Sequence, residues 1–331
     1  MIQIARRTVL AGAGAGIAAG FVSEAAAQPK PEVQASEYWA HKGSVKLSLY
    51  RKRIAPKAGE VQPVLFLVHG SSNSTRSSYD LSVPGKGEYS MMNVFAGYGF
   101  DVWTMDHDGY GHSGSSGNSS DIASGVEDLK AAIPVVVKES GQQKVHMYGT
   151  SSGAIRAGAY AQVEPDRVDR LVLSAFTYKG TGSPEIARRN AVAERYRNNP
   201  RRKRDLAMIR SIFTRDGHAS GYDLAVADAI AAEELKFGDQ IPSGTYLDMA
   251  VNLPLVDPKK VLSPVLMIRG AHDGNSTNED LLDFYAQLAN GDRQFAILPH
   301  TAHSIGYSNN RHLLWYAVRN FLNAPAAIPA A

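Results

Sequence analysis

The sequence predicts an α/β fold in which a mostly parallel central sheet carries helices on both faces. The first observation is a set of continuous apolar runs, typical of strands buried on both faces of a parallel sheet. The second is that stretches with helical periodicity separate these runs, joined to them by short links that contain glycine. The third is a polar cluster after several of the runs, where open α/β sheets place their ligand sites.

In chain order, residues 28–43 are polar and contain two prolines, which indicates an exposed N-terminal arm. Residues 44–51 alternate apolar and polar side chains, which predicts a half-exposed edge strand. Continuous apolar runs predict buried strands over residues 63–68, 100–105, 145–148, 171–176, 265–268 and 295–298. Helical periodicity predicts helices over residues 89–98, 122–139, 152–163, 281–288 and 311–321.

One segment interrupts this alternation of strands and helices. Residues 177–258 contain no convincing strand, but helical stretches cover residues 184–196, 201–213 and 223–235. An insertion of this kind predicts a helical cap over the carboxyl ends of the strands. The chain would then consist of an α/β core, the cap and a flexible tail, over residues 28–176 with 259–323, residues 177–258, and residues 324–331.

Composition and charge exclude several classes of function. The 331 residues are 44% hydrophobic and 20% charged, which is enough for a sizeable core in one large unit. The formal net charge of +3 is too small and too dispersed to indicate a nucleic-acid partner. The chain has no cysteine, and its His and Asp residues show no metal-ligand spacing. We therefore expect neither a metal nor a cofactor.

The first 27 residues have the features of an export signal. Arg6 and Arg7 precede a weakly hydrophobic stretch rich in Gly and Ala, and an A-x-A cleavage pattern follows at residues 25–27. This resembles a twin-arginine signal. The alternative is a short membrane anchor, but the apolar run is shorter than the roughly 20 residues that span a bilayer. We expect a periplasmic or secreted protein whose mature chain does not insert stably into a membrane.

The sequence Gly149-Thr150-Ser151-Ser152-Gly153 lies between a predicted strand and a predicted helix. In that context G-x-S-x-G predicts a sharp turn that holds its serine in a strained backbone conformation. A side chain at either glycine would collide with the neighbouring strand or helix. The helix N-terminus behind the turn favours negative charge nearby. Ser151 is therefore the candidate nucleophile, and a plain Gly/Ser turn is the alternative.

Polar clusters follow four of the predicted strands. They begin at His69, Asp106, Gly270 and Pro299. Because parallel strands present their carboxyl ends at one edge of a sheet, we expect these clusters to lie close to Ser151.

These motifs and the chain order Ser, acid, His resemble the α/β-hydrolase superfamily over about residues 45–321. The resemblance implies an α/β-hydrolase fold, with the cap inserted between strands 6 and 7. It also implies a serine hydrolase, although the motifs say little about the substrate.

The resemblance assigns catalytic roles to three residues. Ser151 is the nucleophile, His303 is the base that accepts its proton, and Asp273 orients the imidazole and stabilises the imidazolium. His300 is a rival base in the same loop. A surface turn is the alternative for Asp273, because Asp-Gly is a common turn pair. We expect His272 to be structural.

The resemblance also implies where the oxyanion is stabilised. One backbone N–H comes from Ser152, the residue after the nucleophile, and the other comes from Ser71, with Ser72 as the alternative. His69 is expected to shape this loop and not to take part in the chemistry.

Two features depart from the family pattern. Asp108 stands where many relatives carry an arginine, which changes the local ion pairing. The loop of residues 72–88 is long and polar, and no second glycine follows His69-Gly70 as it does in lipase-like motifs. We expect this loop to form a flexible wall of the pocket entrance.

The predicted cap carries a concentration of positive charge. Only Glu194 and Asp205 accompany ten basic residues, at positions 188, 189, 195, 197, 201, 202, 203, 204, 210 and 215. One interpretation is that an arginine faces the pocket and pairs with a carboxylate of the substrate. The other is a solvated helix face.

The leading hypothesis is a secreted serine hydrolase that cleaves a carboxylic ester or lactone of a small or medium substrate. An arginine that faces the pocket would favour an anionic substrate. Amide hydrolysis, including aminopeptidase-like activity, C–C bond hydrolysis and a non-catalytic binding protein are the alternatives. Relatives that attack through aspartate are excluded, because Thr150-Ser151 offers no carboxylate at the turn. The sequence leaves the acyl group, the leaving group and the oligomeric state open.

Overall fold

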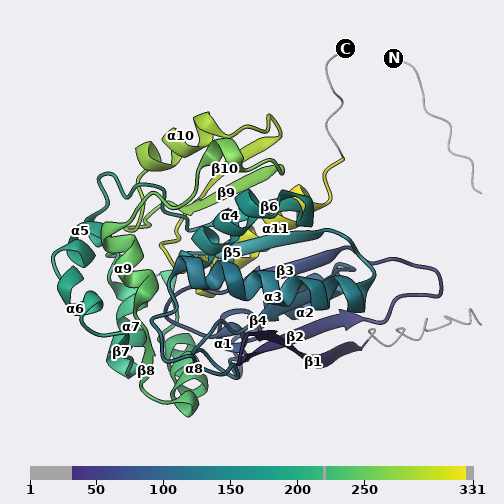
Figure 1. Ribbon diagram of the computed structural model, residues 1–331, viewed down its shortest axis with the longest axis horizontal. Coiled ribbons are helices and arrows are strands. Elements are labelled where there is room, and N and C mark those ends of the chain that lie inside the picture. The colour runs from purple at the N-terminus through teal and green to yellow at the C-terminus, as the bar shows by residue number, and fades with distance from the viewer. Residues whose placement is uncertain (1–31, 219–220, 326–331) are drawn as a thin grey trace, which may run out of the picture. The chain divides into compact units, whose positions relative to one another are not determined.

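The computed structural model of the protein describes residues 32–218 and 221–325. The export signal predicted at residues 1–27 and most of the predicted tail lie outside them. The described residues belong to one compact unit, in which a central sheet lies between two sets of helices (Figure 1).

In the described part of the chain, eight strands form the central sheet, in the order β1-β2-β4-β3-β5-β6-β9-β10. Strand β2 is antiparallel to β1 and to β4, and all other neighbours are parallel. The strands are β1 (Val33–Lys42), β2 (Val45–Ile54), β3 (Val64–Val68), β4 (Asp101–Met105), β5 (Val145–Thr150), β6 (Val168–Ser174), β9 (Val265–Gly270) and β10 (Arg293–Leu298). The predicted α/β-hydrolase fold is confirmed.

The N-terminal part of the sheet differs from the prediction. Residues 33–42 do not form an exposed arm but pair with β2 along its whole length. Strand β1 is therefore the edge strand, and β2 lies inside the sheet. Most side chains of β1 are exposed or half-exposed, so backbone pairing holds it without an apolar pattern that the sequence could reveal.

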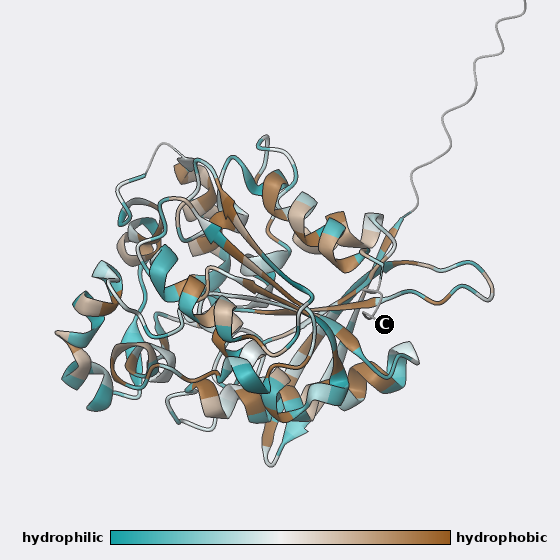
Figure 2. Cartoon of the chain, turned by 90° about the horizontal axis from the view of Figure 1, so that it is seen from above, coloured by the Kyte–Doolittle hydropathy of each residue, from teal (hydrophilic) through white to brown (hydrophobic). Residues whose placement is uncertain are grey.

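The strands bury different side chains on the two faces of the sheet. In β3, Phe66 packs in the core cluster beneath α3 (Ile122–Ser140), α4 (Ser152–Val163) and α10 (Asn278–Gln287). Its neighbour Leu67 packs in the opposite cluster, against α2 (Met91–Gly97) and α11 (Arg311–Leu322). Both faces are covered, which explains why the strands are apolar throughout (Figure 2).

The predicted cap is an insertion between β6 and β9, the sixth and seventh strands of the sheet. It consists of helices α5 (Pro184–Asn190), α6 (Ala193–Arg197), α7 (Leu206–Thr214), α8 (Leu224–Glu234) and α9 (Gly244–Val251), which gather on one side in Figure 1. The prediction of no strand there is wrong, because β7 (Arg201–Lys203) pairs with β8 (Gln240–Pro242). These strands are three residues long and pair across nearly forty residues of sequence, so no local period reveals them.

The loop of residues 72–88 contributes Ser72, Asn73 and Ser78 to the wall of a cavity, as predicted, but buried hydrogen bonds hold it in place. It contains the short helix α1 (Thr75–Tyr79), and polar side chains within it are buried. The Thr75 N–H and hydroxyl both donate to Asp106 Oδ1, at 2.8 Å. Ser74 donates its N–H and its hydroxyl to Glu234 Oε1, each at 2.7 Å. Buried partners from distant segments therefore hold this loop in place.

The chain changes direction across the sheet at β3, whose neighbours are β4 and β5. The loops that follow β3 and β5 therefore diverge at a topological switch point, where doubly wound sheets form their ligand crevices. No helix among the described residues has both the length and the apolar character needed to cross a membrane.

Candidate active site

The turn after β5 has the strained geometry that G-x-S-x-G predicts. Ser151 adopts φ 57° and ψ −128°, a positive-φ conformation that L-residues rarely occupy. A Cβ added to Gly149 would lie 2.3 Å from the carbonyl oxygen of Gly153. One added to Gly153 would lie 2.2 Å from the carbonyl oxygen of Val68. Both positions therefore require glycine, because backbone atoms cannot yield to a side chain.

The structure brings the three predicted triad residues together from three loops. The Ser151 hydroxyl lies 2.8 Å from Nε2 of His303, and Nδ1 of His303 lies 2.9 Å from Oδ1 of Asp273. Asp273 and His303 are buried, and Ser151 lines the cavity described below. With Nδ1 donating to the carboxylate, Nε2 is free to accept the proton of the serine.

The loop that carries Asp273 is fixed by its own strand and by its own backbone. The Arg269 guanidinium, at the end of β9, donates to the carbonyl oxygens of Asp273 and Ser276, at 2.9 and 3.0 Å. The Asn275 N–H donates to Asp273 Oδ1 at 2.8 Å. Burial alone would raise the pKa of the Asp273 carboxyl, but the charge and hydrogen bond of His303, with the Asn275 N–H, hold this pKa below its usual value. Asp273 is therefore ionised at neutral pH.

The two residues predicted to stabilise the oxyanion lie side by side. The Ser71 and Ser152 hydroxyls are 2.6 Å apart. Gly70, just before Ser71, lies against the turn, since a Cβ there would be 3.3 Å from that of Ser151. Within the described residues, neither the Ser71 N–H nor the Ser152 N–H donates a hydrogen bond. Both N–H groups are thus available to an oxyanion on the substrate.

The His69 imidazole is occupied by the backbone of its own loop. Nδ1 lies 2.8 Å from the Gly70 carbonyl oxygen, and Nε2 accepts the His107 N–H at 3.1 Å. Burial, assisted by the charge of Arg156, lowers the pKa of His69 to about 4, so the ring is neutral. Its contacts agree with a role in shaping the loop.

This buried neutral ring makes stability depend on pH. In the unfolded chain the His69 imidazole takes up a proton near pH 6.5, whereas in the folded protein its pKa is about 4. His69 therefore makes its full contribution to the free energy of unfolding above pH 6.5. This contribution falls as the pH drops toward 4, and at pH 5 it is lower by about 2 kcal/mol. We expect His69→Gln to remove that part of the difference between urea unfolding at pH 8 and at pH 5. The exposed His312→Gln is the control, and equal pH slopes for His69→Gln and the wild type would contradict the assignment.

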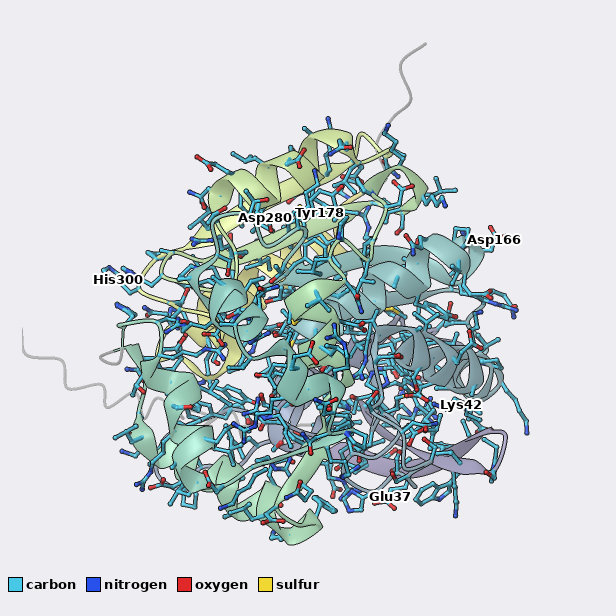
Figure 3. The ribbon with its side chains drawn as sticks, turned by 60° about the vertical axis from the view of Figure 1, so that its left-hand side comes forward. Glu37, Lys42, Asp166, Tyr178, Asp280 and His300 are labelled. Carbon is cyan, nitrogen blue, oxygen red and sulfur yellow. The ribbon has the colours of Figure 1, made fainter. Side chains whose placement is uncertain are left out.

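The histidines at positions 218, 272 and 300 do not belong to the lining of the cavity over Ser151. His300 is exposed and projects from the surface of the molecule (Figure 3). The His272 ring stacks on that of His218, with ring centroids 4.0 Å apart.

Asp108, where relatives carry an arginine, is buried, pairs with Lys42 at 3.2 Å and accepts the Ser116 N–H at 2.8 Å. Within residues 32–218 and 221–325, no group of three His, Cys, Asp or Glu side chains is placed to hold a metal ion.

A small cavity of about 80 Å³ lies over the Ser151 hydroxyl. Its lining includes His303 and Ser71 from the core and four residues from the insertion, Arg189, Ile212, Arg215 and Tyr246. The ten basic residues of the insertion therefore differ in their surroundings, and pairing of a cavity arginine with a substrate carboxylate stays a prediction. Two arginines line the cavity, whereas others, such as Arg188 with a side chain 57% exposed, lie in solvent.

The two cavity arginines share one carboxylate. Arg189 Nε lies 3.3 Å from Glu185 Oε1, and Arg215 Nη1 lies 3.6 Å from the same oxygen. Burial and the charge of Arg215 lower the pKa of Arg189, although a guanidinium stays protonated at any pH that proteins tolerate. Arg215 Nε also lies 3.7 Å from Asp216 Oδ1, so the carboxylates of Glu185 and Asp216 both pair with the cavity arginines.

Several residues of the site gave no signal in the sequence. Asp216 Oδ2 accepts the His303 N–H at 3.1 Å, and Asn275 Nδ2 lies 3.3 Å from the Nε2 of His303. Thr245 and Tyr246 reach the Ser71–Ser72 loop from α9, a helix that was not predicted. Asn275 could have been suspected from its place beside Asp273. The others come from the insertion, where sequence spacing carries no information about contacts with the core.

The sequence of this chain matches a family model and, over part of its length, a known hydrolase. Residues 83–308 match a family model described as serine aminopeptidase, S33. A 2-hydroxy-6-oxononadienedioate/2-hydroxy-6-oxononatrienedioate hydrolase of Paraburkholderia phymatum is 31% identical over 129 residues. That match covers 38% of this chain and only 39% of the relative.

Solved structures share the fold at low sequence identity. A 2-hydroxy-6-oxo-6-phenylhexa-2,4-dienoate hydrolase from a Rhodococcus species gives a TM-score of 0.64 at 16% identity, over 88% of this chain and 100% of that one. A carboxylesterase from Bacillus subtilis gives 0.59 at 16% identity, over 88% and 92%. An enol-lactonase from Burkholderia xenovorans gives 0.55 at 17% identity, over 87% and 100%. At these identities the likeness establishes the fold alone.

Proposed function

Since the chain belongs to the serine aminopeptidase S33 family and is a hydrolase of the α/β-hydrolase superfamily, we propose that it cleaves a carboxylic ester or lactone through an acyl-enzyme on Ser151. The observation that carries the proposal is the unbroken hydrogen-bonded series from Asp273 through His303 to Ser151, which ends at a cavity. Such a series activates a serine hydroxyl that is otherwise a weak nucleophile.

The geometry supports a two-step reaction. The Ser151 oxygen attacks the carbonyl carbon while Nε2 of His303 accepts the hydroxyl proton. The oxyanion formed accepts hydrogen bonds from the N–H groups of Ser71 and Ser152. His303 then gives its proton to the leaving alcohol oxygen, and a water molecule, deprotonated by the same imidazole, releases the acid from Ser151. Throughout, the ionised Asp273 stabilises the imidazolium.

We further propose that the substrate carries a carboxylate. Arg189 and Arg215 line the cavity, where a guanidinium group can donate a charge-assisted hydrogen bond to an anionic substrate. The cavity is small, which favours a compact substrate.

Replacing Arg189 with glutamine should raise KM for anionic esters by about 10- to 100-fold, because one charge-assisted hydrogen bond is lost. Neutral esters of the same shape should keep their KM. The control is Arg195→Gln, which removes an exposed charge of the insertion that does not contact Glu185. Steady-state kinetics on paired neutral and anionic esters measure the difference. An equal rise for both kinds of ester would refute a carboxylate subsite.

A second candidate is hydrolysis of a C–C bond. The sequence match to the Paraburkholderia phymatum hydrolase favours it, although the match spans well under half of that protein. The triad geometry alone is compatible with either reaction.

The proposal includes export to the periplasm or the medium. Arg6, Arg7 and the A-x-A pattern at residues 25–27 support it, and these residues lie outside the described part of the chain. Fractionation of cells producing the native chain or an Arg6→Lys/Arg7→Lys variant tests the location. Retention of the variant alone in the cytoplasm is the expected result.

The test of the proposed function is a panel of substrates with the chain from Gln28 onward. The panel contains chromogenic esters and lactones, aminoacyl anilides and a vinylogous diketone, and a fluorophosphonate probe reports on Ser151. We expect ester or lactone turnover and labelling of Ser151. Turnover of anilides alone would favour the amidase, and turnover of the diketone alone would favour the C–C hydrolase. If no substrate in the panel is turned over and the probe does not label Ser151, the result would indicate a binding protein.

A further inference from the structure

A short chain of hydroxyl groups joins the insertion to the residues proposed to hold the oxyanion. Thr245, the second residue of α9, donates its hydroxyl hydrogen to the Ser71 hydroxyl oxygen at 2.8 Å. The Ser71 hydroxyl lies 2.6 Å from that of Ser152. Thr245 and Ser152 have no exposed surface, and Ser71 is 6% exposed. In such a place water cannot replace a lost partner, so each hydroxyl depends on the next.

Further contacts from the insertion hold the same loop. The Tyr246 hydroxyl lies 2.8 Å from the Ser72 hydroxyl, and Arg204 donates to the Ser72 carbonyl oxygen at 3.2 Å. From the core, the Tyr110 hydroxyl donates to the Ser71 carbonyl oxygen at 3.0 Å. The side chains and carbonyl groups of the loop are thus engaged, which orients its remaining polar groups, the N–H donors.

The helix that presents Thr245 is itself fixed to the core. The Gly244 N–H donates to the Ser119 carbonyl oxygen at 2.8 Å, and the approach is so close that a Cβ on Gly244 would lie 2.7 Å from the same oxygen. Asp248 Oδ2 accepts the Ile122 N–H at 2.8 Å, at the start of α3. Thr245 is therefore a fixed point for the Ser71 hydroxyl and not part of a moving segment.

We propose that Thr245 is a positioning residue for the oxyanion hole and that this insertion residue thereby acts in catalysis without touching the substrate. The inference rests on the proposed function. Oxyanion donors act only when they are preorganised toward the developing charge, and removing one donor outright costs about 100- to 1,000-fold in kcat. Releasing the Ser71 hydroxyl displaces a donor without removing it, so the expected loss is smaller.

Thr245→Val removes the hydroxyl but keeps the shape of the side chain. We expect kcat to fall about 10- to 100-fold while KM stays within about threefold, because the donor acts in the transition state. Affinity for a trifluoromethyl ketone, whose serine adduct carries an oxyanion, should fall by the same factor as kcat/KM. Thr245→Ser, which restores a hydroxyl, should recover most of both.

The matched control is Thr104→Val, because Thr104 is also buried and donates its hydroxyl to a backbone carbonyl oxygen, that of Leu67, at 2.8 Å. We expect this variant to lower Tm without changing kcat or inhibitor affinity. Ser71→Ala, which removes the middle hydroxyl, should reproduce the kcat loss and serves as the second variant if Thr245→Val does not fold.

The outcomes separate the two proposals. Suppose that the wild type hydrolyses esters and that the folded Thr245→Val variant, or Ser71→Ala, keeps the wild-type kcat and ketone affinity. That result would overturn this inference and leave the proposed function intact. Equal losses in Thr245→Val and Thr104→Val would also overturn it, since they would reflect stability. A wild-type chain that neither hydrolyses any ester nor reacts with fluorophosphonate would overturn the proposed function and this inference with it.

Discussion

Replacing Ser151 with alanine should lower kcat for ester hydrolysis by about 10⁵- to 10⁶-fold, the cost of removing the nucleophile from a serine triad. The Ser151 hydroxyl is the group that His303 Nε2 contacts at 2.8 Å, and it stands on a turn that φ 57° directs toward the cavity. The variant should keep its fold, because alanine occupies the same strained backbone with fewer side-chain atoms. It should also lose all labelling by fluorophosphonate.

The control for this prediction is Ser78→Ala, which removes another serine hydroxyl from the lining of the same cavity. It should retain kcat within about threefold and label normally, as a residue outside the reacting groups does. Mass spectrometry of the labelled peptide identifies the modified residue. Turnover by Ser151→Ala within tenfold of the wild type would exclude an acyl-enzyme on this serine.

Replacing Glu234 with alanine should cost about 3 to 5 kcal/mol of unfolding free energy, because the change leaves a buried charge without its partner. Glu234 has no exposed surface, and its carboxylate pairs with Arg204, which is 2% exposed. The same carboxylate accepts hydrogen bonds from the Ser74 N–H, the Ser74 hydroxyl and the Ser77 hydroxyl. The Ser74 N–H and hydroxyl would lose their buried acceptor, whereas the Ser77 hydroxyl keeps the Ser74 carbonyl oxygen at 3.2 Å.

Urea unfolding measures the loss, and the neighbouring residue supplies the control. Glu233 is exposed and pairs with Lys236 at 2.8 Å, so Glu233→Ala should change stability by less than about 1 kcal/mol. The double variant Glu234→Leu/Arg204→Met should recover much of the loss, because it removes both buried charges. If Glu234→Ala unfolds at the same urea concentration as Glu233→Ala, the buried pair does not stabilise the fold.

The features that the sequence predicted have short-range signatures. The turn at Ser151 could be predicted because the G-x-S-x-G pattern is complete within five residues between a predicted strand and a predicted helix, although the atom that excludes a side chain at Gly153, the Val68 carbonyl oxygen, belongs to another strand. The buried strands could be predicted because helices cover both faces of the sheet, so every side chain in a strand such as β3 must be apolar. Asp273 and His303 were found through the resemblance and the strand ends that they follow.

What the sequence did not reveal depends on contacts between distant segments. Strand β1 is held by backbone pairing while its side chains face solvent, so it has no apolar period. Glu234 and Arg204 look like ordinary surface charges of an amphipathic segment until the fold buries them together. Thr245 lies 174 residues from Ser71, and nothing in its neighbourhood distinguishes it from a helix-start threonine.

The contacts between the insertion and the core also affect how the specificity of this hydrolase can be redesigned. Exchanging whole caps between relatives is an attractive way to change specificity, on the view that the cap is a cassette. Here the insertion holds the loop after β3 through Thr245, Tyr246, Arg204 and Glu234. A transplanted cap without equivalents of these side chains would leave buried donors and acceptors of the recipient unpaired. A successful chimera therefore has to carry those four side chains across, whatever new specificity it brings.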